Sequence, residues 1–208
     1  MPKKDPGYAG SKRNRIMQAA IDVFSQKGFF NSKVSDIARA SGVADGTIYI
    51  YFKNKDDLLI SIFEDKMDEL VVDTRKKVGE QACPLDQLRV FIENHMGLPE
   101  NHGGLIELLQ VELRQTSKFM KDYKPVKFFE YLDIVSGIIE AGKESGVFRP
   151  NLNTGVARRV VFGAMDELSR TYLLSKRQKY HPSITASEVF SQLTEGLCVP
   201  RKEKADHA

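Results

Sequence analysis

Apolar residues recur at helical spacing along most of this chain. Ile16, Ala19 and Ala20 are followed by Val23 and Phe24, which is the i, i+3, i+4, i+7, i+8 pattern of one apolar helix face. No window of strict alternation, as a half-buried strand requires, competes with these runs. The sequence therefore predicts an all-α protein of about nine helices.

The N-terminal part predicts three helices followed by a long one. The first helix ends at Gly28. The second helix lies in "VSDIARASG", has Ser32 as a candidate cap and ends at Gly42. The third, "DGTIYIYF", is only about two turns long. Asn54 and Asp57 then have capping-box spacing and begin a helix that reaches about residue 79.

The rest of the chain is also predicted to form helices, and several of their ends are marked by residues that stop or cap a helix. The stretch "LPENHGG" predicts a break, after which the helical pattern resumes over residues 105–117. Asn153 is a candidate cap for a helix over 155–179. Thr185, three residues before a glutamate, predicts that the last helix covers 185–198.

Charge is unevenly distributed. Of 208 residues, 41% are hydrophobic and 28% charged, which is ordinary for a folded globular protein. Through Lys55 the chain carries ten Lys/Arg and four Asp/Glu, giving +6, and the remainder carries 21 against 24, giving −3. A basic head, residues 1–55, on a mildly acidic body, residues 56–208, indicates a polyanionic partner for the head.

The start of the chain, "MPKKDPGYAGSKRNR", is polar and basic. It predicts neither a signal peptide nor a membrane anchor, and no window approaches the roughly 20 apolar residues that span a bilayer. Cys83 and Cys198 lack a CxxC spacing and are expected to be reduced thiols. We therefore expect a cytoplasmic protein that does not enter the membrane.

The second and third helices, separated by "SGVA", have the sizes and the turn of a helix-turn-helix. Gly42 can adopt the positive φ of the turn, and Val43 is expected to pack inward. Thr47 and Tyr49 can donate to phosphate oxygens or base edges, and Gly46 permits close approach. This pattern favours DNA binding.

Other residues of the same segment have a structural interpretation. Ile48 and Phe52, four apart, are expected to hold the third helix on the core, and Lys55 adds a cation. For Tyr51 the sequence leaves open a half-buried core ring or a DNA contact.

No pattern predicts catalysis. The four histidines are scattered, and the chain has no HExxH, no Cys/His metal spacing, no GxSxG and no phosphate-binding glycine loop. We expect a protein that is not an enzyme and needs no cofactor or metal.

The stretch "VSDIARASGVADGTIYIYFKNKDDLL" resembles the DNA-binding domain of TetR-family regulators, a likeness that covers roughly residues 11–62. It implies a homodimer with an N-terminal three-helix helix-turn-helix head and a larger helical ligand-binding and dimerisation body. The family's DNA-contacting positions fall on Ser32, Lys33, Ser35, Gly46, Thr47, Tyr49, Tyr51 and Lys55. Two residues depart from the family pattern: Ala44 replaces a capping serine, and Asp45, read as a helix-end carboxylate, is left out of the contacts.

The body carries a second resemblance. "VELRQTS" and "VVFGAMDELSRTYLLSKRQKY", together with the head, are similar to the TetR-type FadR regulators of fatty-acid degradation. That likeness implies repression of fatty-acid catabolic genes, relieved by long-chain acyl-CoA. Two alternatives are a TetR-type regulator of efflux or other metabolism that senses a different hydrophobic molecule, and a helical ligand-binding protein with a nonfunctional head.

An acyl chain needs a long apolar tunnel between helices. The candidate lining residues, for each of which ordinary bundle core is the competing interpretation, are Leu105, Leu109, Leu113, Phe128, Phe129, Leu132, Met165, Leu168 and Tyr172. The unranked candidates to meet a CoA head group are the cations Arg114, Lys127, Arg158 and Arg159.

Two further expectations concern the C-terminal helices. Asp166 and Glu167 interrupt an apolar helix. Solvated carboxylates are the default interpretation, and hydrogen bonds to a ligand or a place in the dimer interface are the alternatives. The last two helices are predicted to pair with their symmetry mates in a four-helix dimer interface.

Overall fold

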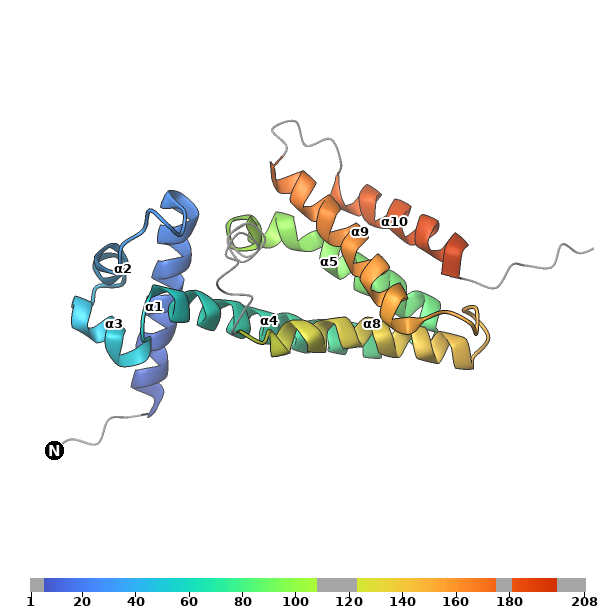
Figure 1. Ribbon diagram of the computed structural model, residues 1–208, viewed down its shortest axis with the longest axis horizontal. Helices are drawn as coiled ribbons and strands as arrows, with labels where there is room; N and C mark the ends of the chain where they lie inside the picture. Colours follow the sequence, from blue (N-terminus) through green and yellow to red (C-terminus); the bar gives the residue numbers. More distant parts are fainter. Residues whose placement is uncertain (1–5, 108–122, 175–180, 198–208) are drawn as a thin grey trace, which may run out of the picture. The chain divides into compact units, whose positions relative to one another are not determined.

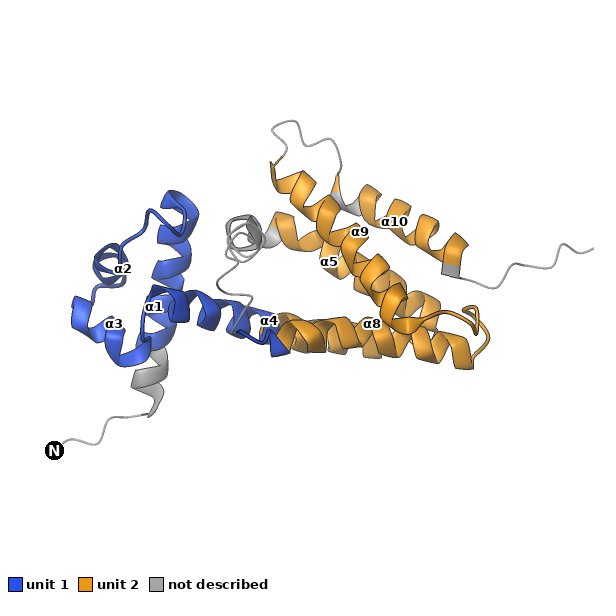
Figure 2. Cartoon of the chain, viewed as in Figure 1, with its two compact units in different colours: residues 1–68, 102–126 blue, residues 69–101, 127–208 orange. Residues whose placement is uncertain are grey.

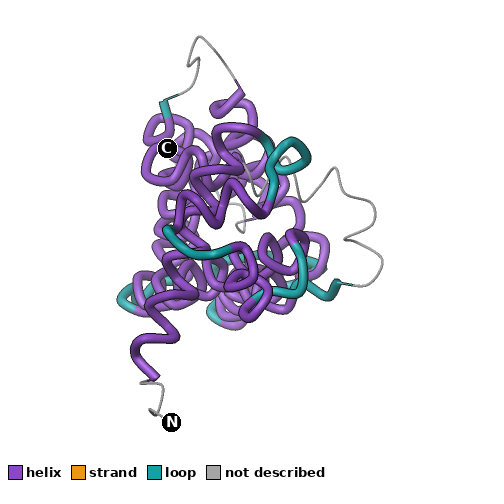
Figure 3. Tube along the Cα trace, turned by 90° about the vertical axis from the view of Figure 1, so that its left-hand side faces the viewer, coloured by secondary structure: helices purple, strands orange, loops and turns teal. Residues whose placement is uncertain are grey.

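The protein is described by a computed structural model that covers residues 6–107, 123–174 and 181–197, and no strand is found in these ranges (Figures 1 and 3). The eight described helices are α1 (Pro6–Lys27), α2 (Val34–Ser41), α3 (Asp45–Tyr51), α4 (Lys55–Gly79), α5 (Pro84–Glu107), α8 (Val126–Glu144), α9 (Thr154–Leu174) and α10 (Pro182–Leu197). The predicted all-α fold is confirmed. None of the described helices is both long enough and apolar enough to cross a membrane.

The chain forms two compact units (Figure 2). The first unit comprises residues 1–68 and 102–126, and the second comprises residues 69–101 and 127–208. Helix α4 contributes its N-terminal part to the first unit and its C-terminal part to the second.

The core of the first unit is built from α1, α2, α3 and the start of α4. Helix α1 packs against α2, and α2 packs against α3. Its fully buried side chains include Phe24 and Phe29, whose rings meet edge to face with centroids 5.2 Å apart. The Arg13 guanidinium joins α1 to α4, because Nη1 donates to the Asp65 carboxylate at 2.6 Å.

Local capping signals set several helix ends as predicted. Gly28 has φ 75° and ends α1, and its N–H donates to the Phe24 carbonyl at 2.8 Å. The Asn54 side chain caps α4 by accepting from the Asp57 N–H at 2.8 Å. The Asn153 side chain likewise accepts from the Val156 N–H at 3.0 Å and caps α9.

The second unit packs α5, α8, α9 and α10 with the end of α4. Its interior includes the fully buried Val135, Ile139 and Met165, and α9 packs against α10. After α8 the chain turns back so that the Phe148 ring fills the space beside Gly142, where a Cβ would overlap that ring.

Three predicted helix boundaries were wrong. The stretch "LPENHGG" does not break the chain, because α5 continues through Pro99 to Glu107. Pro99 is buried, so packing of this helix offsets the lost backbone hydrogen bond of an internal proline. Of the helix predicted over 105–117, the first three residues belong to α5 and 108–117 lie outside the described residues.

The other two errors concern caps. Helix α10 begins at Pro182, so Thr185 lies inside the first turn, where its hydroxyl donates to the His181 carbonyl at 2.9 Å. Ser32 does not cap α2, because its buried hydroxyl donates to the Gly28 carbonyl at 2.7 Å. The residue before α2 is Lys33, and its backbone N–H donates to the carboxylate of Asp36 at 3.3 Å.

Candidate nucleic-acid interface and ligand site

The turn between α2 and α3 has the geometry that the sequence predicts. Gly42 adopts φ 65° and ψ 35°, the left-handed conformation that glycine takes without strain. Its N–H donates to the Arg39 carbonyl at 3.2 Å, and the Val43 N–H donates to the Ala38 carbonyl at 3.0 Å. Val43 packs against the core of the first unit, as expected.

Helix α3 has a buried face and an exposed face. Ile48 and Phe52 are each only 2% exposed, which confirms their predicted role as anchors. On the outward face Tyr49 is 56% exposed and Ile50 is 69% exposed. The orientation of α3 is therefore fixed by its anchors, and its outward side chains are available to a partner.

Gly46 and Thr47 form the N-terminal turn of this helix. Gly46 is exposed, and a Cβ added there would meet no heavy atom within 4 Å. Packing within the described structure therefore does not require glycine at this position, although glycine costs a helix about 0.5–1 kcal/mol relative to alanine. Thr47 is half-buried, and its N–H donates to the carbonyl of Ala44, which caps α3 without a side-chain hydrogen bond.

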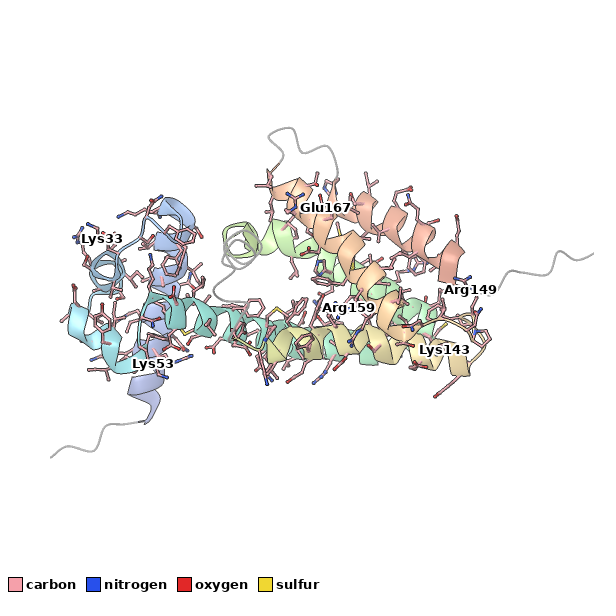
Figure 4. The ribbon with its side chains drawn as sticks, in the orientation of Figure 1. Lys33, Lys53, Lys143, Arg149, Arg159 and Glu167 are labelled. Carbon is pink, nitrogen blue, oxygen red and sulfur yellow. The ribbon has the colours of Figure 1, made fainter. Side chains whose placement is uncertain are left out.

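Two lysines near α2 and α3 are exposed. Lys33 precedes α2 and Lys53 follows α3, and both are labelled in Figure 4. Beside Lys33, the ammonium of Lys27 lies 3.1 Å from the Asp36 carboxylate and lowers the pKa of that carboxyl, with help from the Lys33 N–H. Asp36 therefore stays ionised at the α2 N-terminus, where a negative charge is favourable.

Lys55 points into the first unit. Its ammonium donates to the carbonyls of Phe29 at 2.6 Å and Ser32 at 2.9 Å, and it lies 4.4 Å from the centre of the Phe29 ring. The side chain thus ties the start of α4 to the segment between α1 and α2. Sequence reasoning assigned this cation to DNA and missed its structural role.

The remaining predicted DNA contacts are partly or fully covered. Ser32 is buried, Ser35 is half-buried, and Tyr51 is half-buried against the core. The half-buried ring of Tyr51 agrees with the core interpretation, and its contact with DNA stays a prediction. Among the predicted contacts, the exposed ones are Lys33, Gly46 and Tyr49. Ile50 and Lys53 share that exposure but were not predicted. The spacing of Ile50 from the anchor Ile48 places it on the opposite side of α3, whereas Lys53 lies after the end of the helix.

In the second unit, aromatic side chains from α5, α8 and α9 form one cluster. We call Phe91, His95, Phe128, Tyr131 and Phe162 the aromatic cluster. The Phe162 ring stands edge-on to Phe128 at 5.0 Å and to His95 at 5.7 Å. These contacts join three helices that are distant in sequence.

The aromatic cluster contains one buried polar pair. The Nδ1 atom of His95 lies 3.0 Å from the Tyr131 hydroxyl oxygen. Burial lowers the pKa of His95 to about 4, and it raises the pKa of Tyr131. Both groups are therefore neutral at physiological pH and share one hydrogen bond in an apolar interior.

The predicted ligand-lining residues are differently placed. Leu132 and Met165 are buried, Phe128, Leu168 and Tyr172 are half-buried, and Phe129 is 44% exposed. Leu105 lies in the last turn of α5. Leu109, Leu113 and Arg114 lie outside the described residues.

Two of the predicted CoA-binding cations have carboxylate partners. The Arg158 Nη1 atom donates to Asp133 at 2.6 Å, and the Lys127 ammonium pairs with Glu130 at 3.2 Å. Arg159, labelled in Figure 4, is exposed.

The two carboxylates of α9 differ from each other. Glu167 is exposed, as expected, and accepts from Arg170 at 2.6 Å. Asp166 is buried, which corrects the prediction of a solvated group. The helix phase decides this difference, because adjacent residues point about 100° apart around α9.

Family models match both parts of the chain. The model described as "Bacterial regulatory proteins, tetR family" matches residues 16–62, and the model described as "YsiA-like protein, C-terminal region" matches residues 63–196. The second match alone spans more than half of the chain. The chain belongs to the tetR family.

Relatives of this tetR-family protein agree with the predicted FadR resemblance. It is 34% identical over 197 residues to the fatty acid metabolism regulator protein of Bacillus subtilis (strain 168), a match that covers 95% of this chain and 98% of the relative. The resemblance to FadR regulators is therefore confirmed.

Solved structures support the same conclusion. The crystal structure of the transcriptional regulator FadR from Bacillus subtilis in complex with stearoyl-CoA is 35% identical, with a TM-score of 0.82, and the match covers 88% of this chain and 98% of that one. The fatty acid degradation regulator FadR from Bacillus halodurans is 33% identical, with a TM-score of 0.83, over 94% of this chain and 98% of that one.

Proposed function

We propose that this tetR-family protein is a repressor that binds palindromic operator DNA as a homodimer and is released by long-chain acyl-CoA. It thereby controls genes of fatty-acid degradation. The observation that carries the proposal is the similarity over nearly the whole chain to a fatty acid metabolism regulator and to a FadR bound to stearoyl-CoA. We assign DNA binding to residues 1–55 and effector binding and dimerisation to residues 56–208.

The exposed face of α3 supports the DNA-binding part. Tyr49 offers a hydroxyl, Gly46 leaves room for close approach, and Lys33 and Lys53 add exposed cations. Phosphate contacts fix a protein on DNA, and side chains at base edges read the sequence. In a dimer, two such faces would enter successive major grooves about one helical turn apart.

DNA binding is tested with fragments that the full-length protein selects from a random-sequence library. We expect Lys33→Ala and Lys53→Ala each to weaken binding similarly on all DNA sequences. Each substitution is also expected to reduce the slope of log K against log salt concentration by about one for each phosphate that the lysine neutralised. Lys76→Ala, an exposed lysine of α4 in the second unit, is the matched control. Unchanged affinity and salt dependence in both head variants would refute this surface.

The effector is tested on the protein–DNA complex with acyl-CoAs of increasing chain length. Free CoA and free fatty acid are the controls, because each supplies only one end of the proposed effector. We expect release by long-chain acyl-CoA alone, with a coupling of about 1–3 kcal/mol. If no acyl-CoA releases the DNA, the effector assignment fails while DNA binding stands.

Exposed apolar side chains on α9 and α10 support the dimer. Val156 and Val160 on α9 and Ile184 on α10 are all more than half exposed in the single chain. We expect Val160→Glu to shift the protein toward monomer in sedimentation velocity, because it places a charge in an apolar interface. Val72→Glu, at an exposed valine of α4, is the control, and equal behaviour of the two variants would contradict the interface.

A further inference from the structure

Ile50 is the most exposed of the large apolar residues in the described parts of the chain, at 69%. It stands in the middle of α3, one residue after Tyr49 and on the side away from the anchors Ile48 and Phe52. Its position is fixed, because both anchors are buried in the core of the first unit.

Among the described residues, no packing contact explains an isoleucine at this position. The partly buried apolar side chains that pack on the core of the first unit are Val34, Val43, Tyr51 and Ile60, and Ile50 is not among them. Isoleucine is also a weaker helix former than lysine, glutamate or alanine at a solvent-exposed position. A single exposed apolar residue is ordinary on a protein surface. Evidence for a binding partner of Ile50 therefore has to come from the residues around it.

Those surroundings point to DNA. Gly46, Tyr49 and Ile50 have the i, i+3, i+4 spacing of one helix stripe, and all three are exposed. The exposed Lys53 follows the end of α3. Residues 1–55 carry ten Lys/Arg against four Asp/Glu, so the stripe belongs to a basic segment that suits a polyanion. A negatively charged partner that also offers an apolar group to Ile50 fits this surface.

We propose that Ile50 reads thymine in the operator by packing against its C5-methyl group in the major groove. The inference rests on the proposed DNA-binding function and adds a specificity-determining residue to it. The thymine methyl is the apolar group among the major-groove edges of the four unmodified base pairs. The isoleucine side chain has no hydrogen-bond donor or acceptor, so it gains nothing from phosphates or from the polar edges of the other bases.

The test removes the methyl group and nothing else. Full-length protein first selects fragments from a random-sequence library, and each thymine in the protected region is then replaced singly by deoxyuridine. For the unchanged protein we expect about fourfold weaker binding at one thymine of each half-site, the loss that corresponds to exposing one methyl-sized group. Replacing both thymines is expected to weaken binding about fifteenfold, because separate sites add in free energy.

The variant Ile50→Ala, measured on the same thymine and deoxyuridine fragments, completes a double-mutant cycle between the side chain and the methyl group. It is expected to bind the thymine and deoxyuridine fragments equally, because the methyl no longer has a partner. Val72→Ala, an equally simple truncation of an exposed valine on α4, is expected to keep the full sensitivity to deoxyuridine. Thermal melting of both variants checks the fold, which truncation of an exposed side chain leaves intact.

Three results would overturn the proposal. Either no thymine is sensitive to deoxyuridine in the unchanged protein, or Ile50→Ala keeps the same sensitivity; in both cases Ile50 is not the reader although the protein binds DNA. If the library yields no bound fragment, the proposed function fails and the inference falls with it.

Discussion

Acidification is expected to destabilise the protein through the buried His95. In the folded state burial holds the pKa of His95 at about 4, whereas the unfolded chain has the ordinary value of 6.5. Between these values the unfolded state binds more protons than the folded state, so stability falls as the pH falls. The loss starts near pH 6.5 and levels off below about pH 4.

The magnitude follows from the two pKa values. At pH 4.5 the unfolded histidine is almost fully protonated while the folded one is mostly neutral, and linkage gives a loss of about 2.5 kcal/mol relative to pH 7.5. Asp36 contributes little in this window, because its pKa is lowered from 3.8 and its stabilising contribution is lost only as the pH falls below that value.

The assay is urea unfolding at pH 7.5 and pH 4.5 at one fixed protein concentration, since a dimer's stability depends on concentration. His95→Gln removes the titration and keeps an amide that can hydrogen-bond to Tyr131. We expect this variant to lose about 2.5 kcal/mol less than the unchanged protein between the two pH values. His181→Gln, at an exposed histidine, is the control and should leave the difference within about 1 kcal/mol.

The comparison uses the difference between two pH values, so any constant cost of the substitution cancels. If His95→Gln and the unchanged protein lose the same free energy of unfolding on acidification, His95 is not held neutral by burial.

Two further pairs of variants test packing. Gly142→Ala is expected to lower the free energy of unfolding by about 1–3 kcal/mol, because its Cβ would meet the Phe148 ring, whereas Gly137→Ala in the same helix meets no atom within 4 Å and should stabilise by up to about 1 kcal/mol. Equal effects in thermal melting would contradict the close contact. Lys55→Ala is expected to cost about 2 kcal/mol because its ammonium holds backbone carbonyls, whereas the exposed Lys53→Ala should stay within about 0.5 kcal/mol. A fully stable Lys55→Ala protein would show that the ammonium is not a structural tie.

Much of the fold was predictable because helix signals are local. Periodic apolar residues, glycine stops and asparagine caps act within about four residues, so the all-α class and the caps at Asn54 and Asn153 were correct. Where a local signal met a packed helix, as at Pro99, the prediction failed because burial outweighed the propensity to break.

The sequence by itself determined that the chain is helical, that a helix-turn-helix follows the first helix, and that two apolar anchors orient α3. It did so because these properties depend on neighbours along the chain. Only the tertiary structure decided that the Lys55 ammonium is held by carbonyls 23 to 26 residues away and that His95 is paired with Tyr131, 36 residues further on. Whether a side chain meets solvent or another segment depends on how distant helices pack, and helical periodicity carries no information about that partner.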